Sequence, residues 1–127
     1  MSDMDERPRD PGMAVRREVL GDDYVDRAEA ARTPFNTEFQ DLLTRYAWGE
    51  IWSRPGLDRR TRSSITIAAL VALGRFDELA LHLRAARRNG LSLHEIKEVL
   101  LQTAVYCGVP AANSAFAVFQ RVIAEGE

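Results

Sequence analysis

The chain has 127 residues, of which 46% are hydrophobic and 28% are charged, and its formal net charge is −2 at pH 7. This length accommodates one domain with a buried core and excludes a large two-domain enzyme. The near-neutral charge gives no bias towards nucleic acid or a membrane as a partner.

The first ten residues are polar and charged, so we expect residues 1–10 to form a flexible tail and residues 11–127 to form a single helical domain. The tail lacks the apolar core of a signal peptide. No stretch has the roughly eighteen consecutive apolar residues of a membrane span. We therefore expect a cytoplasmic protein.

The residues that usually carry metal or covalent chemistry are few. Cys107 is the single cysteine, which excludes an intramolecular disulfide and any CxxC redox or zinc motif. His82 and His94 are not spaced as a metal-binding pair on a helix. Lys97 is the single lysine, which disfavours a Schiff-base or pyridoxal mechanism. The sequence therefore predicts no metal site.

Glycine and proline divide the first half of the chain into helical segments. A short helix is predicted from Pro11 to Leu20, and a weaker one from about Asp23 to Ala31. Thr33 and Pro34 then supply a cap and a first-turn proline for a helix that is expected to stop at Gly49. The apolar positions of that helix recur at helical spacing: Phe35, Phe39, Leu42, Leu43 and Tyr46.

The next predicted helix is unusually apolar. Pro55-Gly56 indicates a turn, Asp58 is a suitable N-cap, and the helix is expected to end at Gly74. Residues 65–73 have almost no polar face, whereas a surface helix should be amphipathic. We therefore expect this helix to be central in the fold or to lie against another subunit.

Three sets of boundary signals define the last helices. One helix is predicted from Asp77 to Asn89, with Gly90 as its C′ residue. Ser92-x-x-Glu95 forms a capping box for the next helix, which Gly108-Val109-Pro110 ends. The last helix runs from Pro110 to about Ala124. Because no strand pattern or repeat is present, the predicted fold class is all-α.

His82 is the first candidate catalytic residue. On a helical wheel, Glu78 and His82 lie about 40° apart, on the apolar side of their helix. A lone histidine on such a face is more often a core residue than a catalyst. A carboxylate one turn away can, however, orient an imidazole and hold it protonated as a general acid. We therefore predict a catalytic role for His82 with Glu78.

Arg59 and Arg62 are candidate substrate-binding residues. They fall in the first turns of a helix, where cations oppose the macrodipole and must be tolerated or used. A carboxylate bound there would meet guanidinium groups and backbone N–H groups. An exposed, arginine-rich turn is the alternative. Arg62 borders the buried part of the helix and is the stronger candidate.

Four further residues complete the predicted site. Trp48 and Trp52 could form the wall of a small-molecule pocket or could be packing anchors. Glu50, between them, is an alternative acid if burial raises its pKa. Asn113 could bind a ligand, although capping of the last helix is the simpler interpretation.

Several segments resemble the γ-carboxymuconolactone decarboxylase (4-carboxymuconolactone decarboxylase) family. The similarity runs from about Met13 to Ile123 and is densest in three segments: Arg59–Ser63 through His82–Ala86, Gly90–Glu95, and Ala104–Asn113. The resemblance implies an all-helical fold similar to alkyl hydroperoxide reductase D, which assembles into trimers and hexamers. We accordingly expect a homo-oligomer.

The resemblance also implies an activity. It is the cofactor-free decarboxylation of 4-carboxymuconolactone, a small dicarboxylate lactone, to 3-oxoadipate enol-lactone and CO2 in the protocatechuate branch of the β-ketoadipate pathway. The lactone itself accepts the electrons that decarboxylation releases, so no electron-sink cofactor is required. The site needs cations for a carboxylate, a donor for the developing oxyanion, an apolar wall and a proton source.

Two other functions remain open at this stage. Redox relatives of the fold carry a CxxC just before the histidine that His82 resembles, but Arg75 and Glu78 occupy those positions here. An oxidoreductase or peroxidase of the same fold would thus lack its thiol pair. A non-catalytic helical oligomer is the other alternative.

Overall fold

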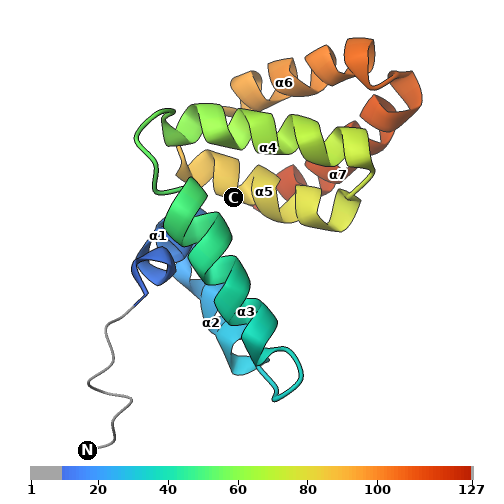
Figure 1. Cartoon of the computed structure of the whole chain (residues 1–127). Helices are drawn as coiled ribbons and strands as arrows, with labels where there is room; N and C mark the ends of the chain where they lie inside the picture. The colour runs from blue at the N-terminus through green and yellow to red at the C-terminus, as the bar shows by residue number, and fades with distance from the viewer. Residues whose placement is uncertain (1–9, 127) are drawn as a thin grey trace, which may run out of the picture. The chain divides into compact units, whose positions relative to one another are not determined.

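A computed structural model of the protein describes residues 10–126. The chain divides into two compact units, the first ending at Pro55 and the second beginning at Gly56. Figure 1 shows that the regular structure of the described residues is helical, which confirms the predicted all-α class. The single domain expected over residues 11–127 stays a prediction, since each unit is described by itself.

The predicted tail lies outside the described residues except for its last member, Asp10. The Asp10 side chain caps the first helix by accepting a hydrogen bond of 2.8 Å from the backbone N–H of Gly12. Asp10 is thus part of the folded chain, because its carboxylate satisfies one of the unpaired N–H groups at a helix N-terminus.

Four helical segments form the first unit. They are α1 (Pro11–Leu20), α2 (Asp22–Ala30), α3 (Thr37–Leu43) and the π-helix η2 (Thr44–Ile51), which continues directly from α3. In this unit α1 packs against η2 and α2. The prediction of two short helices before residue 32 is confirmed, with boundaries shifted by one residue in the second.

The predicted start of the third helix is wrong. The Thr33 hydroxyl accepts hydrogen bonds from the N–H groups of Phe35 and Asn36, both at 3.2 Å, so this segment forms a turn. The helix begins only at Thr37, with Asn36 as its N-cap residue.

The predicted stop at Gly49 is also wrong, and packing explains why. A Cβ atom on Gly12 would lie 2.1 Å from the Thr44 carbonyl oxygen and 2.7 Å from the Gly49 nitrogen. The two glycines therefore let the backbones of α1 and η2 approach each other. Gly49 serves this close contact, and the helix continues through it to Ile51.

A buried arginine joins the helices of the first unit. Arg16 is 3% exposed, and its guanidinium donates to Gln40 Oε1 at 3.1 Å and to Thr44 Oγ1 at 3.4 Å. Glu29 on α2 lies 3.5 Å from the same guanidinium. Burial lowers the pKa of Arg16, and the Glu29 carboxylate opposes that effect. A buried charge is tolerated only when it is paired in this way.

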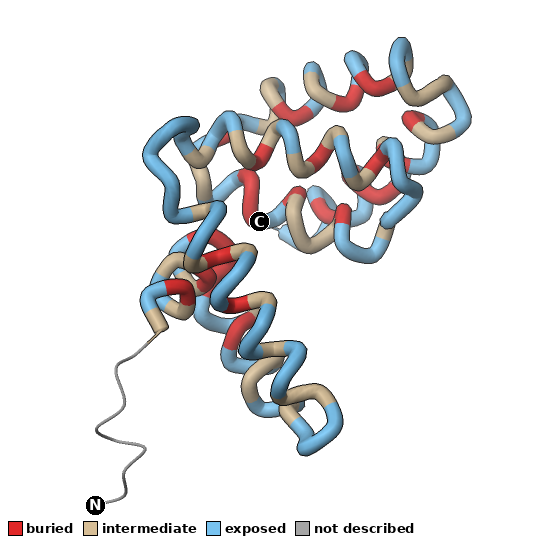
Figure 2. Tube along the Cα trace, viewed as in Figure 1, coloured by how far each residue is buried: buried red, intermediate tan, exposed pale blue. Residues whose placement is uncertain are grey.

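Four helices form the second unit: α4 (Arg59–Leu73), α5 (Phe76–Arg88), α6 (Leu93–Tyr106) and α7 (Val109–Ala124). Helix α4 contacts each of the other three. Their buried residues, red in Figure 2, form one apolar core. Its fully buried large side chains are Ile67, Val71, Leu79, Leu83, Ile96 and Leu100.

The predicted boundary signals of this unit are confirmed. The Asp58 carboxylate accepts from the Thr61 N–H at 2.8 Å, and Gly74 ends α4 in the left-handed region at φ 70°. Ser92 and Glu95 form the reciprocal capping box of α6. These boundaries could be predicted because each capping residue lies within a few residues of the backbone groups that it satisfies.

Large apolar side chains remain exposed on α4 and α6. We call this set the α4–α6 apolar face, and it comprises Ile65, Leu73, Leu101, Val105 and Tyr106. Helix α4 is thus central on one side and exposed and apolar on the other. None of the described helices has the length and apolarity needed to cross a membrane.

Candidate functional site

His82 lies on α5, next to the fully buried Leu83. Its side chain is largely enclosed, and desolvation lowers its pKa from 6.5 to about 4. Burial disfavours the charged imidazolium, since a charge loses its hydration in an apolar environment. The imidazole is therefore neutral near pH 7, which corrects the expectation that it is held protonated.

Glu78 lies one turn before His82, in the first turn of α5. The side chains of residues four positions apart are neighbours on a helix surface. Glu78 is exposed, and desolvation is the cause of the His82 pKa shift. A contact between the Glu78 carboxylate and the imidazole stays a prediction, and burial decides the charge state of His82.

Arg59 and Arg62 are half-buried and lie in the first turns of α4, as predicted. The Asp58 carboxylate already occupies the Thr61 N–H at this helix terminus, and that hydrogen bond lowers the pKa of Asp58. Fewer backbone donors therefore remain for an anion than the sequence suggested. The guanidinium groups of Arg59 and Arg62 would have to supply most of the carboxylate binding.

A polar contact that the sequence did not predict joins α4 to α5. The Asn89 side-chain amide donates a hydrogen bond of 2.9 Å to the hydroxyl of Ser63. Ser63 is 1% exposed and directly follows Arg62, whereas Asn89 is the C-cap residue of α5. The two residues are 26 positions apart, so no local pattern could have paired them.

The predicted tryptophans belong to the first unit. Trp48 and Trp52 lie in and just after η2, and their ring centroids are 5.3 Å apart with planes tilted by 33°. Trp48 is 6% exposed, and Trp52 is half-buried. Glu50, between them, is exposed. The two rings pack against each other, and their role as a pocket wall stays a prediction.

Asn113 does not cap α7. The N-cap residue of that helix is Gly108, which makes no side-chain cap, and Asn113 lies beyond the first turn in an exposed position. The capping interpretation of Asn113 is therefore wrong, because the helix begins earlier than its proline suggested. Binding of a ligand by Asn113 stays a prediction.

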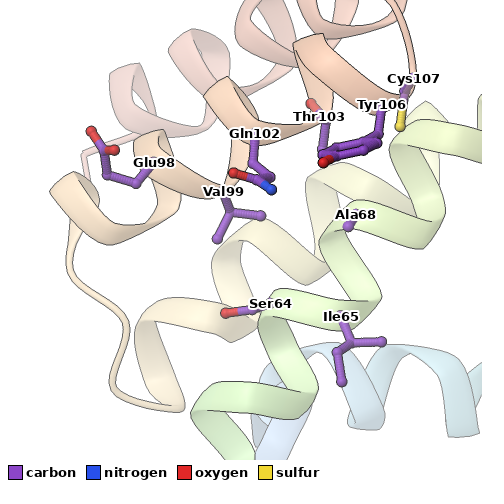
Figure 3. A pocket seen from close by; sticks show the side chains of 9 residues that line it. All are labelled: Ser64, Ile65, Ala68, Glu98, Val99, Gln102, Thr103, Tyr106 and Cys107. Carbon is purple, nitrogen blue, oxygen red and sulfur yellow. The ribbon is translucent and has the colours of Figure 1, made fainter.

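A cleft of about 490 Å³ runs between α4 and α6 in the second unit. It is lined by Ser64, Ile65 and Ala68 on α4 and by Val99 and Tyr106 on α6, as labelled in Figure 3. None of the predicted site residues is among those that line it. Cys107 is half-buried at its edge. The lining of the cleft is mostly apolar and includes the carboxylate of Glu98 but neither lysine nor arginine, so the cleft is poorly suited to bind a dicarboxylate.

Residues 37–121 match the carboxymuconolactone decarboxylase family. A 4-carboxymuconolactone decarboxylase of Acinetobacter baylyi is 49% identical over 118 residues, which cover 93% of this chain and 88% of the relative. The nitrosuccinic acid decarboxylase NpaB of Metarhizium robertsii is 45% identical over 114 residues, which cover 90% of this chain and 80% of the relative.

Proposed function

Since the chain belongs to the carboxymuconolactone decarboxylase family and is a carboxy-lyase, we propose that it converts 4-carboxymuconolactone to 3-oxoadipate enol-lactone and CO2. The observation that carries this proposal is the similarity to the Acinetobacter decarboxylase along nearly the whole chain. The reaction would serve the protocatechuate branch of aromatic catabolism.

The substrate supplies its own electron sink. The bond between the ring carbon and the departing carboxylate breaks, and its electron pair enters the conjugated lactone as a dienolate. A proton then adds to carbon to give the enol-lactone. The protein has to bind the retained carboxylate, stabilise the dienolate oxygen and exclude water from the departing carboxylate.

Arg62 binds the retained carboxylate in this proposal, and Arg59 assists it. Both lie at the positive end of the α4 macrodipole, where a bound anion is favoured. A guanidinium presents two parallel N–H groups to a carboxylate, which fixes its orientation as well as its charge.

His82 stabilises the developing oxyanion as a neutral hydrogen-bond donor. A neutral imidazole has one N–H, and its low pKa keeps the ring in this state throughout the neutral range. A fixed donor in a largely dry site costs little reorganisation when charge develops. Glu78 would orient the ring, and water would supply the proton that ends on carbon.

A second candidate substrate is nitrosuccinate, favoured by the similarity to NpaB. Loss of the carboxylate next to the nitro group gives a nitronate, which is then protonated on carbon. In both reactions the substrate retains one carboxylate, and the electron pair released by decarboxylation moves to an oxygen of the substrate itself. The same arginine and histidine roles would therefore serve either one.

A second copy of the chain is the proposed partner of the α4–α6 apolar face. Its side chains are between 47% and 81% exposed, and two of them, Ile65 and Tyr106, line the mostly apolar cleft. Large apolar side chains exposed together on neighbouring helices favour an interaction site. We propose a homo-oligomer, with the trimer or hexamer of the family resemblance as its expected size.

The test of the function is the decay of enzymatically generated 4-carboxymuconolactone, followed by ultraviolet absorbance beside an equal concentration of nitrosuccinate. The proposal predicts decay well above the spontaneous rate and faster turnover of the lactone. Faster turnover of nitrosuccinate would select the second candidate. If neither substrate decayed above its spontaneous rate, both would be rejected.

A further inference from the structure

Two hydrogen-bonded contacts join the start of α4 to the end of α5 and the turn after it. The inner contact is the bond of 2.9 Å from the Asn89 amide to the Ser63 hydroxyl. The outer contact is made by the Arg60 guanidinium, which donates to the Gly90 carbonyl and pairs with Glu95. Both contacts lie within the second unit.

Of the two contacts, the inner one is better suited to fix how α4 lies against α5. Ser63 is 1% exposed, so water cannot easily replace its partner. The outer contact is exposed, with side chains of Arg60 and Glu95 that are 46% and 40% accessible. An exposed ion pair of this kind contributes little and is screened by salt.

The Ser63–Asn89 bond lies between the two predicted catalytic elements. Ser63 directly follows Arg62 on α4, and Asn89 ends the helix that carries His82. The two helices also share an apolar core, to which Ile67 and Leu83 belong. Apolar packing is not directional, whereas a hydrogen bond restricts both distance and angle.

We infer that Ser63 and Asn89 are positioning residues, which set the register of α4 against α5 and so hold Arg62 at a fixed place relative to His82. This inference rests on the proposed decarboxylation. Without the Ser63–Asn89 hydrogen bond, Arg62 still binds the substrate carboxylate, but the reacting carbon is displaced from His82. A displacement of about 1 Å caused by a change remote from the chemistry can reduce turnover about 100-fold.

The test compares two adjacent serines of α4. Ser63→Ala removes the hydroxyl that reaches α5. Ser64→Ala is the matched control, because the Ser64 hydroxyl donates at 3.1 Å to the Arg60 carbonyl within its own helix. We expect Ser63→Ala to lower kcat by about 10- to 100-fold while KM changes less than about threefold. Ser64→Ala should leave both constants within about twofold of the wild type.

Asn89→Ala and the double variant complete the experiment. If one hydrogen bond carries the effect, Asn89→Ala lowers kcat as Ser63→Ala does, and the double variant is no slower than either single variant. Thermal unfolding of all variants, measured alongside, separates turnover from loss of the folded state.

Three results would overturn the inference. The first is a wild type that is active while Ser63→Ala and Ser64→Ala have the same kcat. The second is a fall in activity of Ser63→Ala and Asn89→Ala that merely follows the unfolded fraction at the assay temperature. The third is a wild type without decarboxylase activity, which would reject the proposed function as well and is thereby distinguished from the other two.

Discussion

The side chain of His82 shows how burial sets chemistry at a single residue. The sequence suggested that Glu78 would keep the imidazole charged, but desolvation lowers its pKa to about 4. Pattern reasoning identified the position of His82 and not its charge state. Position follows from helical spacing, whereas desolvation depends on side chains brought together from other helices.

Protonation of His82 should make the protein less stable in acid. The unfolded chain binds a proton near pH 6.5 and the folded chain only near pH 4, so stability is greatest above pH 6.5 and declines as the pH falls towards 4. Between pH 8 and pH 5 the loss from this group is about 2 kcal/mol.

This pH dependence can be measured by thermal unfolding at pH 8 and pH 5. His82→Gln should lose less stability across that interval than the wild type. His94 is exposed, so His94→Gln is the matched control and should behave like the wild type. Equal losses for both variants would show that His82 is not buried in its neutral form.

Arg62→Lys tests carboxylate binding. Lysine keeps the charge but loses the two-pronged guanidinium, so KM should rise about tenfold while kcat changes less than about threefold. Arg88 is exposed at the end of α5, and Arg88→Lys should leave both constants unchanged. An unchanged KM for Arg62→Lys would remove Arg62 from the site.

At the scale of the helices, local signals were predictable and distant contacts were not. The caps Asp58, Gly74 and Ser92 lie within a few residues of the groups they satisfy, so the boundaries of the second unit were foreseen. The π-helix η2 was not, because it depends on the approach of α1 to Gly49. The Ser63–Asn89 hydrogen bond was not predicted either, because it also joins residues that are far apart in the sequence.

Gly12→Ala tests the contact of α1 with η2. The added Cβ would lie 2.1 Å from the Thr44 carbonyl oxygen, so one backbone must move. We expect a loss of about 1–3 kcal/mol in the free energy of unfolding, measured with denaturant. Gly56→Ala is the control, since its Cβ would meet no described atom within 4 Å. Equal stability of the two variants would contradict the close packing.

At the scale of the whole molecule, several large apolar side chains of the second unit are exposed. Helix α4 has almost no polar face from Ile65 to Leu73, and the expectation that it is central or meets another subunit came from that pattern alone. Tyr106 and Val105 on α6, 81% and 74% exposed, extend the same surface. The sequence predicted an apolar face on α4, but it did not predict that α6 also contributes exposed apolar side chains.

Val105→Glu tests the proposed assembly. An unpaired charge buried in an interface is costly, so the variant should dissociate to a smaller species in light scattering coupled to size-exclusion chromatography. Ser114→Glu, at an exposed site on α7, should keep the mass of the wild type. A wild type that is monomeric at micromolar concentration would reject the assembly.

In the proposed reaction, CO2 leaves 4-carboxymuconolactone while a neutral His82 donates a hydrogen bond to the developing oxyanion. The most direct measurement is the CO2 released per lactone consumed, with the wild type and with His82→Ala. We expect one CO2 per lactone for the wild type and a folded His82→Ala variant that is about 10²–10³-fold slower. No release above the spontaneous rate, or a folded His82→Ala variant as fast as the wild type, would contradict it.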